Sequence, residues 1–253
     1  MKTFIIYLKE REHSVRQSKE MFKTLTDYGH DVEYFEGVSG TTAVELAKQE
    51  NRSPYPYSIK SLKKELSDIQ DYIIPNRWNE LSTKYNLSIF EKQPYSEEEL
   101  KKISRPGVIG CFYSHYKLWE RCVMLDEPII IFEDDIKFFR NVEVTDWEDV
   151  LILALGKNSY LKDPWKTYLE DPSGTPRIIP WKNTTMPGNQ GYAIRPKAAK
   201  RLIKKYHDCY LPADNAINQQ ICQIEISTYI MGREMSTDEG NLSSIKTQNG
   251  DPW

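Results

Sequence analysis

Hydrophobic and polar positions along the chain predict strands and helices in turn. Residues 3–8 form a short apolar run rich in β-favouring side chains, which is typical of a buried strand. Residues 14–28 carry apolar positions on one side of a predicted helix, and Gly29 follows as its end. Residues 32–35 predict a second strand. Strand, helix and strand within forty residues are the opening of a nucleotide-binding α/β fold.

The same pattern continues in the second half of the chain. A helix is predicted over residues 111–125, and the run 128–132 suits a central strand because its apolar residues are continuous. Further strands are expected at 150–155, 191–194 and 226–231, with a basic helix from Pro196 to Tyr206. Residues 157–187 are predicted to be rich in loops, and the polar tail from Ser236 is predicted to be irregular.

Residues 41–105 break this alternation. They are polar, carry runs of like charge and are punctuated by prolines. We interpret them as an inserted helical region on one catalytic domain spanning 1–253, placed on the acceptor side, and not as an independent domain.

Composition narrows the class of protein. The chain has 253 residues with 39% hydrophobic side chains, enough for a real core, and its net charge is −3. A global basic field for nucleic acid is therefore absent. The apolar runs are too short for a signal sequence or a membrane span, so we expect a cytoplasmic protein. Its four cysteines form no CxxC pair, which favours buried free thiols.

The triplet Glu133-Asp134-Asp135 follows the predicted central strand directly. If the strand continued through it, Glu133 and Asp135 would share a face and Asp134 would point away. Carboxylates at the carboxyl end of such a strand lie where open α/β sheets bind ligands, and they suit Mg²⁺ or Mn²⁺ shared with phosphate oxygens. On spacing alone, an acidic turn that caps the next element explains the triplet equally well.

The residues around the triplet favour the metal interpretation. The segment Gly107-Val108-Ile109-Gly110-Cys111-Phe112-Tyr113-Ser114-His115 with Trp119, followed by Phe132-Glu133-Asp134-Asp135, resembles glycosyltransferase family 25. That family includes bacterial lipopolysaccharide sugar transferases and collagen galactosyltransferases. Similar stretches open the chain at Ile5–Leu8 with Arg11, and continue at 35–40, 188–202 and 212–214. The resemblance covers about residues 3–40 and 106–215.

This resemblance implies a GT-A-type, Rossmann-like α/β fold with a mixed sheet. It also implies an inverting transferase that takes a sugar from a nucleotide sugar, expected to be linked to uridine diphosphate, and passes it to a hydroxyl of a lipopolysaccharide or another glycan. Asp135 and Glu133 would hold Mn²⁺ or Mg²⁺ against the leaving diphosphate. Contacts with the donor are expected from eight residues: Leu8, Arg11, Ser114, His115, Glu133, Gln190, Gly191 and Tyr192.

An inverting reaction also needs a base for the acceptor hydroxyl. Asp214 matches the family's Pro-x-Asp position, although it could equally cap a helix that begins near Asn215. Asp134 is the alternative base. Many GT-A enzymes use a further metal ligand near the C-terminus, and here Asp238 or Asn241 would have to serve.

Three other functions compete with this one. A phage-type transferase that glycosylates a modified DNA base would need a basic groove from Arg52, Lys60, Lys63, Lys64 and Arg77. A non-catalytic sugar-nucleotide-binding protein would keep the fold without turnover. A nucleotidyltransferase ranks last because residues 9–13 contain no glycine for a phosphate loop. The sequence names neither the sugar nor the acceptor, and we expect 41–105 and 157–187 to determine both.

Overall fold

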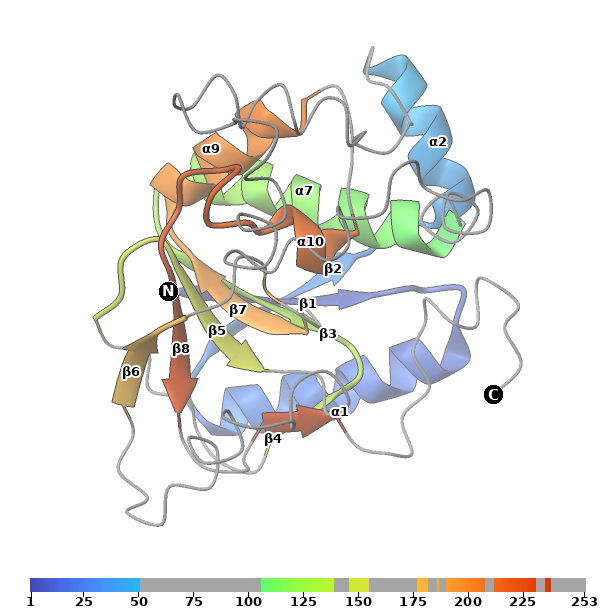
Figure 1. Ribbon diagram of the computed structural model, residues 1–253. Coiled ribbons are helices and arrows are strands. Elements are labelled where there is room, and N and C mark those ends of the chain that lie inside the picture. The colour runs from blue at the N-terminus through green and yellow to red at the C-terminus, as the bar shows by residue number, and fades with distance from the viewer. Residues whose placement is uncertain are drawn as a thin grey trace.

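The computed structural model describes residues 1–50, 106–138, 146–154, 177–181, 186, 190–207, 212–230 and 235–237. A mixed α/β sheet lies between two layers of helices (Figure 1). The helices are α1 (Glu12–Asp27), α2 (Gly40–Gln49), α7 (Pro106–Leu125), α9 (Pro196–Lys205) and α10 (Ala213–Ala216). The strands are β1 (Lys2–Tyr7), β2 (Asp31–Glu36), β3 (Ile129–Glu133), β4 (Ile136–Phe138), β5 (Val150–Ala154), β6 (Arg177–Pro180), β7 (Gly191–Ile194), β8 (Ile226–Ile230) and β9 (Met235–Thr237).

Within the described residues, seven strands form one sheet in the order β2-β1-β3-β7-β5-β8-β6. The three strands β2, β1 and β3 run parallel. Strand β7 is antiparallel to both β3 and β5, and β6 is antiparallel to β8. A smaller pair, β4 and β9, is also antiparallel. The α/β class predicted from the apolar runs is confirmed, and so is the mixed sheet that the resemblance implies.

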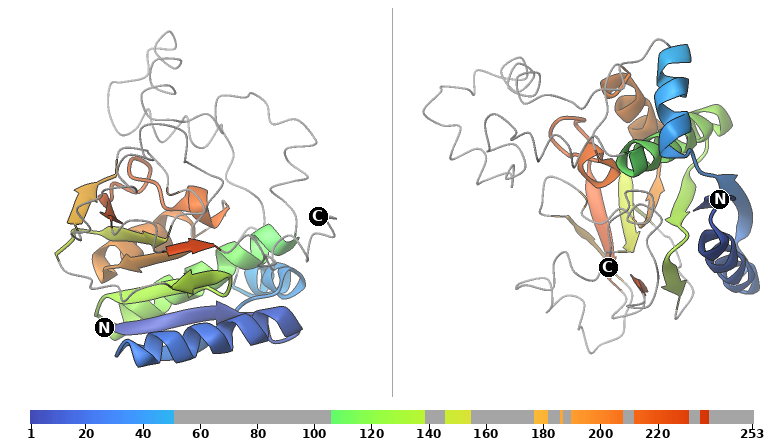
Figure 2. Two further views of the ribbon diagram at one scale, coloured as in Figure 1. Left: turned by 90° about the horizontal axis from the view of Figure 1, so that it is seen from below. Right: turned by 90° about the vertical axis from the view of Figure 1, so that its right-hand side faces the viewer.

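The two faces of the sheet are covered by different helices. Helix α1 packs on one face, and α2, α7, α9 and α10 lie over the other (Figures 1 and 2). Alternate strand residues serve the two faces, as the pleat requires. In β3, for example, Ile129 and Ile131 join the core under α7, whereas Ile130 and Phe132 join the core over α1.

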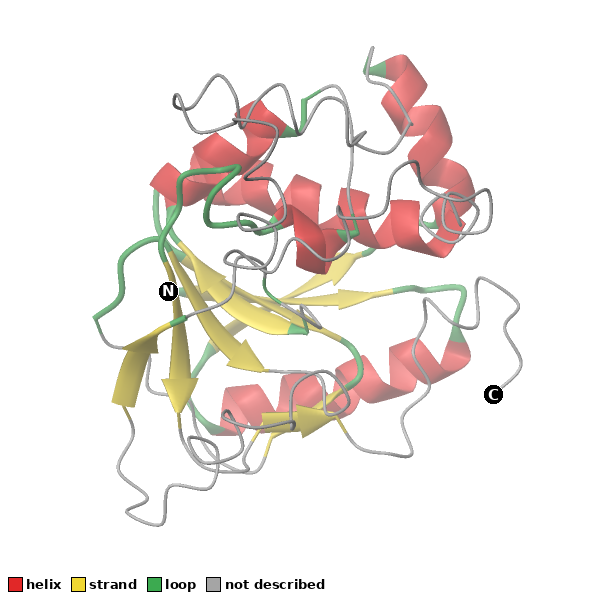
Figure 3. Ribbon diagram, in the orientation of Figure 1, coloured by secondary structure: helices red, strands yellow, loops and turns green. Residues whose placement is uncertain are grey.

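Helix α7 is the central element of the larger layer. It contacts α2, α9 and α10, and colouring by secondary structure shows these helices together above the strands (Figure 3). Its first turn approaches the loop after β2 so closely that a Cβ on Gly110 would lie 2.5 Å from the Val38 carbonyl oxygen. Only glycine fits there without a backbone shift. Among the described helices, none combines the length and apolar character needed to cross a bilayer.

Several elements differ from the sequence-based expectations. Residues 177–180 form β6 inside the stretch predicted to be loops, and 235–237 form β9 where the tail was predicted to be irregular. Both strands are short, so their periodicity is too weak to read, and each is stabilised by a distant partner. Of the expected insertion, residues 41–49 belong to α2, which packs on α7. Residues 51–105 lie outside the described residues.

Candidate active site

The acidic triplet lies at the carboxyl end of β3, as the sequence predicts. Strand β3 ends at Glu133, and Asp134 and Asp135 form a turn before β4. The alternation of faces expected for an extended triplet therefore does not apply. Instead both aspartates are buried, each with 7% of its surface exposed. Parallel pairing aligns Glu133 with Ile6, so the loop after β1 begins beside the triplet.

Glu133 contacts two polar side chains of α7. The Cys111 thiol donates to Glu133 Oε1 at 3.5 Å, and His115 Nε2 lies 3.2 Å from the same oxygen. Cys111 and His115 are four residues apart and therefore lie on the same helix face. These three potential ligand atoms lie within 4.8 Å of one another. The structure thus brings together the triplet and the helix motif, which the sequence could relate only by resemblance.

The carboxyl groups of the site repel one another. Burial, with the nearby Asp134 carboxylate, raises the pKa of Glu133 to about 8. Burial, with the charges of Glu133 and Asp134, also raises the pKa of Asp135, while a hydrogen bond from the Gln190 side chain opposes that rise. Burial and the neighbouring charges each disfavour the ionised form, whereas the hydrogen bond from Gln190 favours it. A divalent cation would relieve this repulsion, and hard carboxylate oxygens are the ligands that Mg²⁺ and Mn²⁺ prefer. The residues present therefore fit such a cation.

Asp214 faces the same cluster from α10, which packs on α7. Its charge contributes to raising the pKa values of Glu133 and Cys111 and opposes the effect of burial on His115. Pro212 holds the cap position of α10, so Asp214 lies inside the first turn and is not the residue that caps the helix. Asp214 thus belongs to the site geometrically, and its role as the base stays a prediction.

His115 is completely buried, and burial lowers the pKa of its imidazole to about 3, so the ring is neutral. Its Nδ1 lies 3.0 Å from the hydroxyl of Tyr192, a residue that is itself fully buried. Tyr192 therefore stands behind His115 in the core and would reach a donor only through that ring. Gln190 and Gly191 lie closer to the triplet: Gln190 accepts the Glu133 N–H at 2.8 Å, and Gly191 pairs with Phe132.

The remaining predicted donor contacts divide into two kinds. Ser114 is buried, and its hydroxyl accepts the Val38 N–H and donates to the Gly110 carbonyl, both at 2.8 Å. It ties α7 to the loop after β2, a structural role that the sequence did not reveal. Leu8 and Arg11 lie in the turn after β1, with the Arg11 N–H donating to the Leu8 carbonyl.

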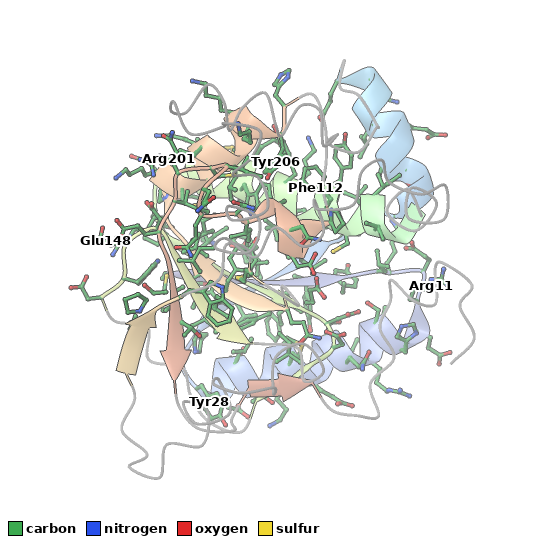
Figure 4. The ribbon with its side chains drawn as sticks, in the orientation of Figure 1. Arg11, Tyr28, Phe112, Glu148, Arg201 and Tyr206 are labelled. Carbon is green, nitrogen blue, oxygen red and sulfur yellow. The ribbon has the colours of Figure 1, made fainter. Side chains whose placement is uncertain are left out.

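Arg11 lies at the start of α1 (Figure 4). Its guanidinium Nε is buried and makes no hydrogen bond to the described part of the chain, so one donor of this group is unsatisfied.

The C-terminal end of the site is described only in part. Strand β9 pairs Thr237 with Ile136, so the chain comes back to the element that follows the triplet. Asp238 and Asn241, the two candidates for a further metal ligand, lie outside the described residues. So do Arg52, Lys60, Lys63, Lys64 and Arg77, the basic residues on which a DNA-binding groove would depend.

Comparisons with known proteins agree with this geometry. Residues 1–217 match the family model described as glycosyltransferase family 25 (LPS biosynthesis protein). The lipooligosaccharide biosynthesis protein lic2B of Haemophilus influenzae is 29% identical over 149 residues, covering 54% of this chain and 55% of that protein. A glycosyltransferase 25 family member of Anopheles gambiae is 28% identical over 134 residues, covering 53% of this chain and 17% of that protein.

The mouse inactive glycosyltransferase 25 family member 3 is 41% identical over 68 residues, covering 25% of this chain and 11% of that protein. The chain thus spans between about a tenth and about half of the length of these relatives. The match to the family model nevertheless extends from β1 through α10, and so includes the triplet, the motif of α7 and Asp214. This chain is a member of glycosyltransferase family 25.

Proposed function

We propose that the protein is an inverting, cation-dependent glycosyltransferase. It moves a sugar from a nucleotide sugar, a uridine diphosphate sugar in our proposal, to a hydroxyl of a lipopolysaccharide-type glycan. The observation that carries the proposal is the convergence of Glu133 and Asp135, at the end of β3, with Asp214 of α10 on one cluster. The family model and the relative from Haemophilus influenzae support the class of acceptor.

Asp135 and Glu133 would hold the cation. When bound, Mg²⁺ or Mn²⁺ neutralises charge that develops on a departing diphosphate. The chain's own contribution is to arrange two carboxylates at the end of β3 and to hold Glu133 with two donors from α7. Arg11, from the turn after β1, supplies a positive group for the donor's phosphates.

The acceptor side needs a proton acceptor. In our proposal Asp214 takes the proton from the acceptor hydroxyl, because it faces the cluster from α10, on a different element from β3. Asp134 is the second candidate. It is as buried as Asp135 and adjacent in sequence to both proposed cation ligands, so it also adds to the charge that the cation must balance.

Donor hydrolysis with a panel of uridine, guanosine and cytidine diphosphate sugars tests this proposal. We expect one donor to be hydrolysed with Mn²⁺ and not with EDTA, and we expect Asp135→Asn to lose the activity. Hydrolysis unchanged in Asp135→Asn would refute the cation assignment. Binding of a donor with no hydrolysis or transfer at all would favour a non-catalytic protein, a result worth separating because one relative is described as inactive.

A further inference from the structure

A chain of hydrogen bonds runs through the core to the acidic triplet. The indole Nε1–H of Trp119 donates to the Tyr192 hydroxyl at 2.8 Å. That hydroxyl lies 3.0 Å from His115 Nδ1, and His115 Nε2 lies 3.2 Å from Glu133 Oε1. Trp119, Tyr192 and His115 are all completely buried. The rings of His115 and Tyr192 also stack, with centroids 5.7 Å apart.

The direction of the protons in this chain follows from its two ends. An indole N–H can only donate, and Glu133 in the ionised form that a bound cation requires can only accept. The Tyr192 oxygen accepts from Trp119, so its own O–H is the donor and His115 Nδ1 is the acceptor within reach. His115 then carries its proton on Nε2 and donates it to Glu133. The network thus assigns the Nε2–H tautomer.

The opposite direction of donation along this chain would leave a buried donor without an acceptor. If His115 carried its proton on Nδ1, the Tyr192 oxygen would accept two hydrogen bonds, and its own buried proton would have no acceptor in the network. His115 Nε2 would then need a proton from Glu133, so that carboxyl group would have to be neutral. A neutral acid is the wrong state for binding a cation.

In this network the two carboxylate oxygens of Glu133 have different roles. Within the described residues, the Cys111 thiol and His115 Nε2 both reach Oε1. Cys111, His115 and Trp119 follow one another at intervals of four residues and so form a row along α7 that faces the ends of β3 and β7. One oxygen of the carboxylate is thereby fixed by the protein, and Oε2 is the oxygen left to face a ligand.

We propose that Tyr192, with Trp119 behind it, is a positioning residue of the cation site: it sets the tautomer of His115, which in turn orients the Glu133 carboxylate. This inference rests on the proposed function because it takes Glu133 to be a cation ligand. Tyr192, which the sequence predicted to contact the donor, is thereby assigned a supporting role behind the site. Outer groups of this kind typically contribute about 10- to 100-fold to metal affinity.

The chain offers matched controls for the key variant. Tyr206 and Tyr116 are buried tyrosines of the same core, with 1% and 0% of their surfaces exposed. The Tyr206 hydroxyl accepts from the Cys222 thiol, and the Tyr116 hydroxyl donates to the Ile203 carbonyl. Tyr206 lies in the helical layer beside Phe112 (Figure 4). Phenylalanine at either position removes a buried hydroxyl without touching the chain to Glu133.

Two readouts on the intact protein test the inference. Nitrogen NMR of histidine-labelled protein, with His115 assigned from a His115→Gln variant, reports the tautomer. Calorimetry with Mn²⁺ reports the dissociation constant. With Mg²⁺ bound, so that Glu133 is ionised, we expect the Nε2–H form in the wild type and a mixture of tautomers in Tyr192→Phe. Mn²⁺ binding should be about 10- to 100-fold weaker in that variant. Tyr206→Phe and Tyr116→Phe should leave both readouts unchanged.

Either of two results would overturn the inference: His115 in the Nδ1–H form in the wild type, or Mn²⁺ affinity in Tyr192→Phe equal to that of Tyr206→Phe. If Tyr192→Phe does not fold, Trp119→Phe replaces it. Loss of the indole donor leaves the Tyr192 hydroxyl free to turn away from His115 Nδ1, so Mn²⁺ binding should weaken, and an affinity equal to that of Tyr206→Phe would contradict the chain.

The inference and the proposed function fail in different ways. The expected tautomer and weakened cation binding, without turnover of any nucleotide sugar, would support the chain and count against the transferase. Turnover with His115 in the Nδ1–H form would support the transferase and overturn the chain.

Discussion

The two faces of the central sheet bury different kinds of side chain. The face under α1 has an apolar core in which Met21 and Leu25 lie with Ile5, Ile130 and Leu151, and the polar side chains that α1 buries, Ser14, Gln17 and Ser18, are all uncharged. The face under α7 mixes large aromatic side chains with buried polar groups, among them Ser114, His115 and the hydroxyl of Tyr192. Buried polar groups contribute to a unique structure only when each is satisfied. The comparison teaches that one face mainly stabilises the sheet, while the other also positions the site.

The largest effect is expected from Asp135→Asn, on the α7 side of this comparison. Activity should fall on the order of 100-fold or more, the scale of losing one electrostatic stabiliser, because the substitution removes a charged ligand from the cation. The folded structure should persist. Asp149→Asn is the matched control. Asp149 is also buried, but it accepts hydrogen bonds from the Arg201 side chain and the Glu225 N–H, two residues that are far along the chain from the triplet. Equal losses of activity in the two variants would contradict the assignment.

Leu25→Ala tests the opposite face. Leu25 is completely buried between α1 and the sheet, and its truncation should lower the free energy of unfolding by about 2–5 kcal/mol through lost burial and a cavity. Urea denaturation measures this change. Mn²⁺ affinity, measured below the unfolding range, should stay at the wild-type value. A weakened cation site in this variant would show that the two faces are not separate in function.

Gly110→Ala should affect both stability and the site. The new Cβ would meet the Val38 carbonyl oxygen at 2.5 Å and the Gly40 nitrogen at 2.9 Å, and these backbone atoms cannot rotate away. We expect a loss of about 1–3 kcal/mol, typical of overpacking, together with weaker Mn²⁺ binding because α7 carries Cys111 and His115. Gly29→Ala on the α1 side is the comparison. Its positive φ strains alanine, but nothing lies within 4 Å of the added Cβ, so only stability should fall.

The smallest effect is expected in the pH dependence of stability without cation. The pKa of Glu133 is raised from 4.5 to about 8, so its ionisation costs stability as pH rises through that interval. The pKa of His115 is lowered from 6.5 to about 3, so its contribution rises with pH over that range and is complete above about 6.5. Between pH 6.5 and 8 the Glu133 contribution therefore dominates, and the melting temperature should fall.

Glu133→Gln removes this carboxyl group and should flatten the melting curve between pH 6.5 and 8. Parallel curves for the variant and the wild type would contradict the assigned pKa of Glu133.

Most strands could be predicted from the sequence because they are continuous apolar runs. Strands β1, β3, β5 and β7 begin and end within about two residues of the expected positions. Their order could not be predicted. Strand β7 lies antiparallel between β3 and β5, a placement that depends on tertiary packing and leaves no local signal. The extended form assumed for the triplet was wrong for the same reason, since the chain turns at Asp134 to begin β4.

The segments that form the candidate site could be predicted from the sequence, but the contacts between their side chains could not. Cys111, His115 and Trp119 follow at intervals of four residues on one face of α7, where His115 and Trp119 are completely buried and Cys111 is partly buried. The contact between His115 and Tyr192 joins residues 77 positions apart and could not be found from spacing. The resemblance to the family placed Tyr192 near the donor without indicating that it lies behind His115.

Binding of uridine diphosphate with and without Mn²⁺ tests the central claim most directly, namely that the carboxylates at the end of β3 hold a nucleotide through a cation. Calorimetry on the wild type, on Asp135→Asn and on Asp149→Asn measures it. We predict binding with Mn²⁺ and none with EDTA in the wild type and in Asp149→Asn, and none under either condition in Asp135→Asn. Equal binding with Mn²⁺ and with EDTA, or undiminished binding in Asp135→Asn, would contradict the account.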